Sequence, residues 1–142
     1  MLYRQFYSEL GKLLYAIADI DGMISAKEKK KLKEVVSKEL APSEIHRDEF
    51  GTDAAYYAEF EFEILEEARY EPEVAFESFL NFIENHKTAI DENMIWATHR
   101  VAAKLAEAYY HTNKKEKQMI DRLNKKLEAL LAEKNRLYQE QH

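Results

Sequence analysis

The sequence predicts an all-α, single-domain bundle of about six helices with a long C-terminal helix. The first observation behind this fold class is the scarcity of helix breakers, since three glycines and two prolines stand in 142 residues, where average usage would give roughly 17 of the two together. The second is that apolar residues recur three and four positions apart in successive segments, which is the period of amphipathic helices. A chain of this length suits one domain, so we expect one all-helical domain over residues 1–142.

The first two helices are expected over residues 2–18 and 25–39. A polar turn that contains Gly22 separates them, because glycine and aspartate together favour a turn. Ser25 and Glu28 then form a capping box, in which the serine hydroxyl accepts a hydrogen bond from the Glu28 amide and begins the second helix. The expected inward faces are Leu2, Phe6, Leu10, Leu13, Leu14 and Ile17 in the first helix, and Leu32, Val35 and Val36 in the second.

A third helix is expected over residues 53–69, although residues 59–64 alternate glutamates with apolar side chains as a strand would. We favour the helix because both flanks are rich in strong helix formers and no partner strand is evident elsewhere. Residues 42–52 form the expected irregular segment before it. Pro72 suits the first turn of a fourth helix, where its missing amide hydrogen is not needed.

Aromatic residues gather in the third and fourth helices, and we expect them to form a core that packs one of these helices on the other. They are Tyr56, Tyr57, Phe60, Phe62, Phe76, Phe79 and Phe82. A groove for an aromatic ligand or a peptide is the alternative. The third helix also carries Glu59, Glu61, Glu63, Glu66 and Glu67. This acidic run predicts a solvated face, and it would equally suit a basic partner.

Asp91 is the expected N-cap of a fifth helix, and residues 113–142 are expected to form the long C-terminal helix. That last helix carries a short heptad stripe of Ile120, Leu123, Leu127, Leu130, Lys134 and Leu137. One interpretation is a long helix packed on its own domain. The other is a pairing element, through which two copies of the chain form a homodimer.

Composition excludes several classes of function. Without cysteine the chain has no disulfide, no thiolate metal site and no cysteine nucleophile. Its few glycines form no phosphate-binding loop, and a net charge of −6 disfavours general binding of nucleic acid. The sequence contains no run of about 18 apolar residues, so no membrane span is expected. The first residues lack the features of a signal peptide, so we expect a cytoplasmic protein.

Four oxygen-bearing side chains surround the polar turn between the first two helices: Asp19, Asp21, Ser25 and Glu28. Hard cations such as Ca²⁺ and Mg²⁺ prefer oxygen ligands, so this turn is the candidate metal site. A complete calcium loop is not expected, because Ile17 would stand at its first ligand position. The structural alternative is that these residues only end one helix, form the turn and cap the next helix.

The segment LLYAIADIDGMISAKEKKKLKEVV resembles the signature of the TerB-like family, which is named for tellurite resistance. The residues that carry the match are Ala18, Asp21, Gly22, Ile24, Ser25 and Glu28. The resemblance implies an all-α bundle, acidic residues that bind divalent cations, and association with stress-related partner proteins. It makes Asp19, Asp21 and Glu28 candidate ligands, with Glu107 and Glu116 as weaker candidates in a degenerate second copy of the motif. That copy lacks an Asp-Gly turn, and residues 42–70 have no counterpart in the family pattern.

The sequence therefore predicts a non-enzymatic TerB-like interaction module with a protein partner and a weak divalent-cation site. A purely structural or scaffolding helical module without metal is one alternative. An enzyme that acts on a small substrate through a carboxylate cluster is a less favoured one, because the sequence offers no nucleophile–base pair and no cofactor motif.

Overall fold

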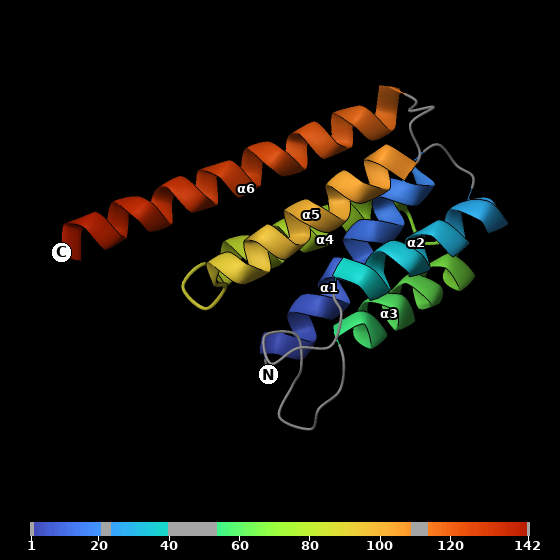
Figure 1. Cartoon of the computed structure of the whole chain (residues 1–142), viewed down its shortest axis with the longest axis horizontal. Coiled ribbons are helices and arrows are strands. Elements are labelled where there is room, and N and C mark those ends of the chain that lie inside the picture. The colour runs from blue at the N-terminus through green and yellow to red at the C-terminus, as the bar shows by residue number, and fades with distance from the viewer. Residues whose placement is uncertain (1, 21–23, 40–53, 109–113, 142) are drawn as a thin grey trace.

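The computed structural model describes residues 2–20, 24–39, 54–108 and 114–141. These residues form six α-helices and no strand, which confirms the all-α prediction and the helical nature of the third segment. Among the described residues, no helix has the length and apolar character needed to cross a membrane. The helices are α1 (Leu2–Asp19), α2 (Ala26–Glu39), α3 (Ala54–Ala68), α4 (Pro72–Asn85), α5 (Glu92–Ala108) and α6 (Lys114–Gln141), as Figure 1 shows.

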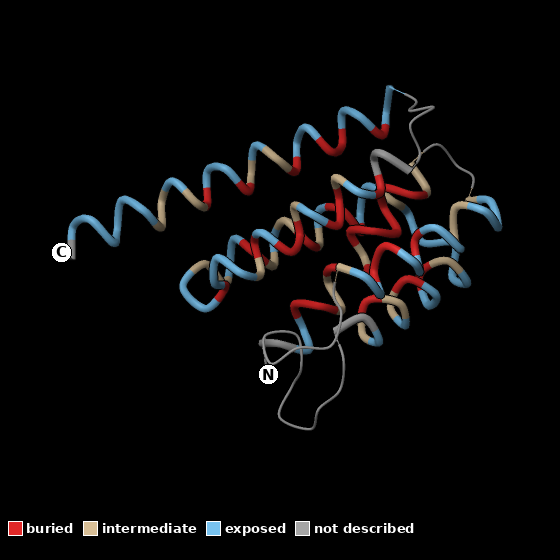
Figure 2. Tube along the Cα trace, viewed as in Figure 1, coloured by how far each residue is buried: buried red, intermediate tan, exposed pale blue. Residues whose placement is uncertain are grey.

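Helix α1 forms the centre of the bundle. It packs against α3 on one side and α4 on another, while α2 packs on α5 and α3, and α6 packs on α5. Buried positions therefore occupy more of the surface of α1 than one stripe (Figure 2): Tyr7, Tyr15 and Ala16 are buried in addition to the expected residues, whereas Arg4 and Gln5 are exposed. The sequence predicted one apolar stripe on this helix, and the buried surface of α1 is wider than that stripe.

Gly11 lies where α1 and α3 approach most closely. A Cβ atom built on Gly11 would lie 2.4 Å from the backbone oxygen of Ala58 and 3.0 Å from the Cβ of Glu61. Glycine in the middle of a helix costs about 1 kcal/mol relative to alanine, so its presence here requires a packing reason. The close backbone contact provides that reason.

The predicted aromatic core between α3 and α4 is wrong, because α1 lies between them. Phe62 of α3 contacts the ring of Tyr15 at 5.9 Å between centroids, and Phe79 of α4 contacts the ring of Phe6 at 6.2 Å. Both partners belong to α1. Of the remaining aromatic residues of α3, Tyr56 and Phe60 are exposed, whereas Tyr57 is partly buried and packs against the core.

Local signals at the helix ends agree with the sequence. The amide of Met94 donates to Oδ1 of Asp91 at 2.9 Å, and Pro72 stands in the first turn of α4. Helix α3 ends just before Arg69, whose φ of 53° lies in the left-handed region. Glycine is the usual residue at such a position. The amides of Arg69 and Tyr70 donate back to the carbonyl oxygens of Glu66 and Leu65, which is the pattern of a Schellman motif.

Helix α6 packs on its own bundle along most of its heptad stripe. Its buried residues are Glu116, Met119, Ile120, Leu123, Leu127 and Leu130. Ion pairs to α4 flank this seam: Arg122 bonds Glu73 and Glu77, and Lys126 bonds Glu84. Beyond Leu130 the helix carries no buried residue among those described, and it extends away from the bundle (Figures 1 and 2). The stripe therefore belongs to the core of this chain as far as Leu130.

Candidate functional site

The acidic turn predicted as a cation site joins α1 to α2. Asp19 is the last residue of α1, and Ser25 directly precedes α2. The amide of Glu28 donates to Oγ of Ser25 at 3.1 Å, so Ser25 is the predicted N-cap. Asp21 lies outside the described residues. The structure thus places three of the four predicted ligands, and the hydroxyl of Ser25 already has a structural role.

Asp19 faces a pocket of about 340 Å³ that is lined by Tyr15, Asp19, Ile24, Glu66 and Arg69. Glu66 of α3 supplies the second carboxylate of this pocket, a residue that the sequence did not connect with the turn. Lys29 forms an ion pair with Glu66 at 2.9 Å, and Arg69 brings a further positive charge. These two cationic side chains weaken the attraction that the two carboxylates exert on a metal ion.

No three histidine, aspartate or glutamate side chains lie close enough together to hold a metal ion in the part of the chain that the structure describes. Because Asp21 is not in that part, the predicted ligand set is described only partly. Of the two weaker candidates, Glu116 is buried in the first turn of α6. The positive end of the helix dipole stabilises a carboxylate at this position. The side chain of Glu107 lies outside the described part.

Tyr15 connects this turn to the beginning of α4. Its hydroxyl group lies 2.6 Å from the carbonyl oxygen of Tyr70 and 3.1 Å from Oδ2 of Asp19, so its single hydrogen is donated to one of these two acceptors or shared between them. Burial of the ring and the hydrogen bond to the Asp19 carboxylate raise the pKa of Tyr15 above its usual value. The neutral hydroxyl is therefore part of the native packing between α1 and the α3–α4 connection.

We expect Tyr15→Phe to lower the free energy of unfolding by about 1–2 kcal/mol at neutral pH, because two partly buried hydrogen-bond acceptors lose their donor. Above pH of about 10 an unfolded tyrosine releases its proton, whereas the raised pKa of Tyr15 keeps the folded form protonated. The wild type therefore loses stability by up to about 1.4 kcal/mol per pH unit more than the variant does. Urea unfolding measured from neutral to alkaline pH should show the two stability curves converging above pH of about 10; parallel curves would contradict this role.

A second candidate site is the outer face of α3. Three large apolar side chains follow one another four residues apart on this face, and Tyr56, Phe60 and Ile64 are 57%, 52% and 43% exposed. The rings of Tyr56 and Phe60 stack at 5.9 Å with an interplanar angle of 12°. Residues four apart lie on the same side of a helix, so the three form a continuous strip, which we call the α3 strip.

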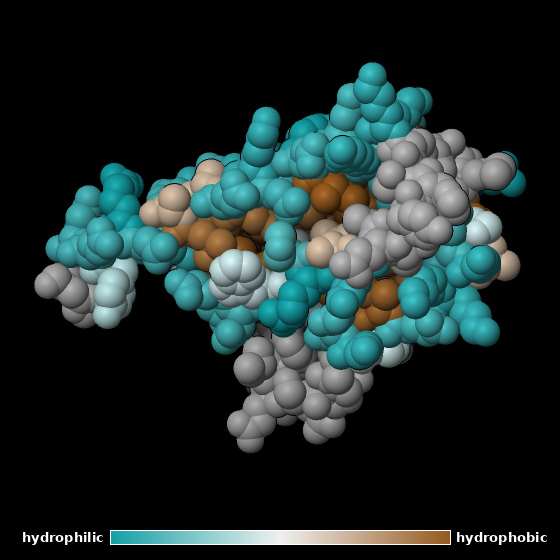
Figure 3. All heavy atoms as spheres, turned by 45° about the horizontal axis from the view of Figure 1, so that its top comes forward, coloured by the Kyte–Doolittle hydropathy of each residue, from teal (hydrophilic) through white to brown (hydrophobic). Residues whose placement is uncertain are grey.

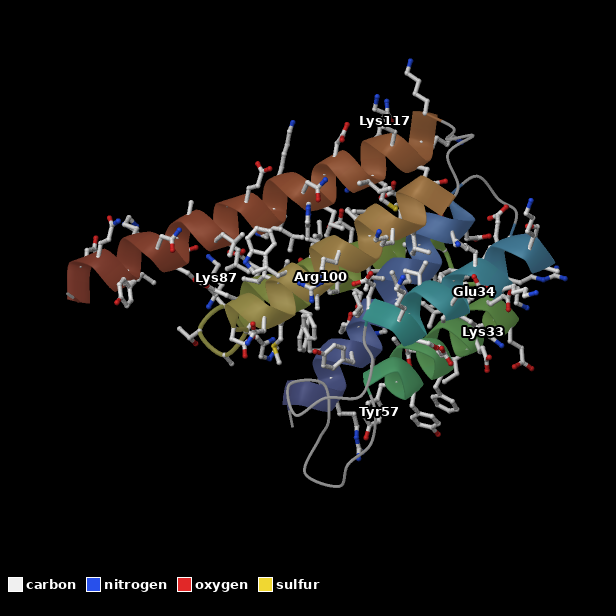
Figure 4. All side chains as sticks on the ribbon, in the orientation of Figure 1. Lys33, Glu34, Tyr57, Lys87, Arg100 and Lys117 are labelled. Carbon is white, nitrogen blue, oxygen red and sulfur yellow. The ribbon has the colours of Figure 1, made fainter. Side chains whose placement is uncertain are left out.

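Acidic side chains accompany the α3 strip. Helix α3 contains five glutamates and no lysine or arginine. Along the edge that faces α2, Lys33 pairs with Glu63 at 3.5 Å and Lys29 pairs with Glu66 at 2.9 Å, and Figure 4 shows Lys33 extending from α2 on the side of α3. Both side chains of the Lys33–Glu63 pair are more than half exposed, so the pair contributes about 0–1 kcal/mol to stability. Replacing Lys33 by a lysine of a partner as the contact of Glu63 would therefore cost little.

The helical spacing of this strip is present in the sequence, but a strand-like spacing overlaps with it. Tyr56, Phe60 and Ile64 have the helical spacing of four, whereas Phe60, Phe62 and Ile64 have the strand spacing of two. Once α3 is a helix, Phe62 lies on its inner face and the other three lie on its outer face. Of the aromatic residues for which a ligand or peptide groove is the alternative, Tyr56 and Phe60 are thus the exposed ones on α3.

Comparison with known proteins gives no match to a protein-family model, to a curated protein or to a solved structure.

Proposed function

We propose that this chain is a non-enzymatic, TerB-like interaction module that binds a basic amphipathic helix of a partner protein along the α3 strip. The observation that carries the proposal is the exposure of Tyr56, Phe60 and Ile64 on one helical face. Aromatic side chains are enriched among the residues that dominate protein interfaces. Contiguous exposed apolar surface on a folded domain is itself a sign of an interaction site.

The charge of α3 supports the choice of a basic partner. Glu63 and Glu67 lie beside the strip and are exposed, so a helix with lysines or arginines beside its own apolar stripe would meet opposite charge. An amphipathic helix presents such anchors at every third or fourth residue. The spacing of the α3 strip matches that pattern, because its three residues are four positions apart.

The experiment uses a labelled synthetic peptide of leucines and lysines in amphipathic helical order, with fluorescence anisotropy as the readout. We expect the protein to bind this peptide, and Phe60→Ala to weaken binding by about tenfold or more, equivalent to about 1.4 kcal/mol. Val74→Ala is the matched control, since Val74 is a similarly exposed apolar residue of α4. Equal binding of a peptide with glutamates in place of the lysines, or no effect of Phe60→Ala, would refute the proposal.

A weak Ca²⁺ or Mg²⁺ site at the Asp19–Glu28 turn is the second part of the proposal, and it rests on the TerB-like motif with Asp21. Bound cation would stiffen the connection between α1 and α2. We expect millimolar Ca²⁺ to shift the NMR amide resonances of residues 19–28, and Asp21→Ala to abolish the shifts. Asp121→Ala is the control, because Asp121 is an exposed aspartate of α6. Unchanged spectra in millimolar Ca²⁺ and Mg²⁺ would remove the cation site and leave the α3 strip untouched.

A further inference from the structure

The C-terminal end of α6 extends past the helices on which it packs. With a rise of about 1.5 Å per residue, the 28 residues of α6 span about 42 Å, whereas the 17 residues of α5 span about 26 Å. Figure 1 shows the end of α6 free of the bundle. This projecting segment carries Leu137 and Tyr138, which are 41% and 64% exposed.

A hollow of about 650 Å³ lies between this projecting segment and the α4–α5 connection. Its volume falls in the range of about 300–1,000 Å³ that is usual for binding pockets. Ile90 and Leu130 are buried and form its apolar floor, while Leu137 and Tyr138 line its outer wall. Figure 3 shows hydrophobic side chains at the surface beside the C-terminal half of α6.

The polar groups around the hollow differ in how well they are satisfied. Lys87 lies at the inner end of the hollow, below α6 in Figure 4, and it pairs with Glu84 at 3.0 Å and Glu133 at 3.2 Å. Lys134 donates to the carbonyl oxygen of Lys87 at 2.7 Å. These contacts fix the position of α6 at the hollow, and they leave its basic groups already engaged.

An exposed acidic side chain lines the hollow, and an exposed basic side chain stands on the projecting segment. On the bundle side, Glu92 is exposed in the first turn of α5. On the projecting segment, Arg136 is exposed and its contact with Glu140 is long, at 3.9 Å. Within one chain Arg136 contacts Glu140 of its own helix, whereas a second α6 lying in the hollow would bring its Arg136 to Glu92.

We propose that two copies of this chain form a dimer in which the projecting end of each α6 lies antiparallel in the hollow of the other. A twofold interface requires that one patch of surface complement itself. The apolar side chains of the projecting segment stand next to an apolar hollow, so each copy offers both halves of the contact. The charges of Arg136 and Glu92 complement each other in the same way across the axis.

This dimer uses a different part of α6 from the one expected from the heptad stripe. The stripe as far as Leu130 is buried within one chain, and only its last apolar member, Leu137, takes part in the proposed contact. Because the contact involves only the last turns of α6, we expect an affinity in the micromolar range or weaker, typical of small interfaces. The oligomeric state is therefore expected to depend on protein concentration.

Size-exclusion chromatography with light scattering tests the dimer, from micromolar to millimolar protein. We expect the wild-type mass to rise with concentration from 16.8 kDa towards twice that value. The double variant Leu137→Glu/Tyr138→Glu is expected to stay monomeric and folded, because both side chains are exposed. Phe60→Glu is the matched control and should still dimerise, since the α3 strip plays no part. A monomeric wild type at millimolar concentration, or a double variant that still dimerises, overturns the proposal.

A charge exchange tests the antiparallel arrangement. Arg136→Glu and Glu92→Arg alone should each weaken the dimer, because like charges then meet across the axis. The combined variant Arg136→Glu/Glu92→Arg should restore the dissociation constant to within a few-fold of the wild-type value. A combined variant that dimerises as weakly as the single variants would refute this placement of α6 in the hollow. Since none of these positions belongs to the α3 strip, the outcome is independent of peptide binding there.

Discussion

Gly11→Ala is expected to lower the free energy of unfolding by about 1–3 kcal/mol, the range typical of overpacked cores. The sign is the informative part of this result. Alanine in place of glycine inside a helix ordinarily stabilises it by about 1 kcal/mol. At Gly11 the new methyl group would lie 2.4 Å from the carbonyl oxygen of Ala58, so α1 and α3 must separate. Gly11→Val should cost more, because its branched side chain is larger.

Urea unfolding followed by circular dichroism measures the effect, and two variants sharpen its interpretation. Gln5→Ala places an alanine on the exposed side of α1 and should change stability by about 0.5 kcal/mol or less. Ala58→Gly should not rescue Gly11→Ala, because the contact involves the backbone oxygen of residue 58 and survives the loss of its side chain. A Gly11→Ala variant that is more stable than the wild type would contradict the close approach of the two helices.

The features that the sequence predicted correctly depend on neighbouring residues. Ser25 caps α2, Asp91 caps α5 and Pro72 stands in the first turn of α4, and each of these signals acts within one helical turn. The helical period likewise predicted the six segments and the inward face of α2. Such features follow from backbone geometry and amphipathicity, and they do not depend on which helix packs on which.

The features that the sequence did not predict depend on how helices meet. Nothing near Gly11 indicates that α3 will approach it, and no local pattern places α1 between α3 and α4. The same holds at the candidate cation site, where Glu66 of α3, a residue distant in the sequence, is the second carboxylate beside Asp19 among the described residues that line the pocket. Contacts between residues distant in the sequence are set by the whole core, so they were inaccessible to spacing and composition.

Leu127→Asp is expected to lower the free energy of unfolding by at least about 4 kcal/mol, a loss seen only where a core is disrupted. Leu127 is 3% exposed and packs in the seam between α6 and the bundle. Removing a buried leucine side chain costs about 2–5 kcal/mol. The carboxylate adds the cost of burying an unpaired charge. Had the heptad stripe been a pairing seam, this variant would instead remain a folded monomer.

Leu137→Asp is the matched comparison, because the same substitution stands on the same stripe of the same helix. Leu137 is exposed and lies beyond the part of α6 that packs on the bundle, so its stability at micromolar concentration should differ from that of the wild type by about 0.5 kcal/mol or less. At millimolar concentration the variant should not form the proposed dimer. Urea unfolding and light scattering on the two variants therefore test two separate roles of α6, that of Leu127 in the fold and that of Leu137 in the proposed contact with a second copy. Equal stability losses for both variants would show that the end of α6 packs within its own chain.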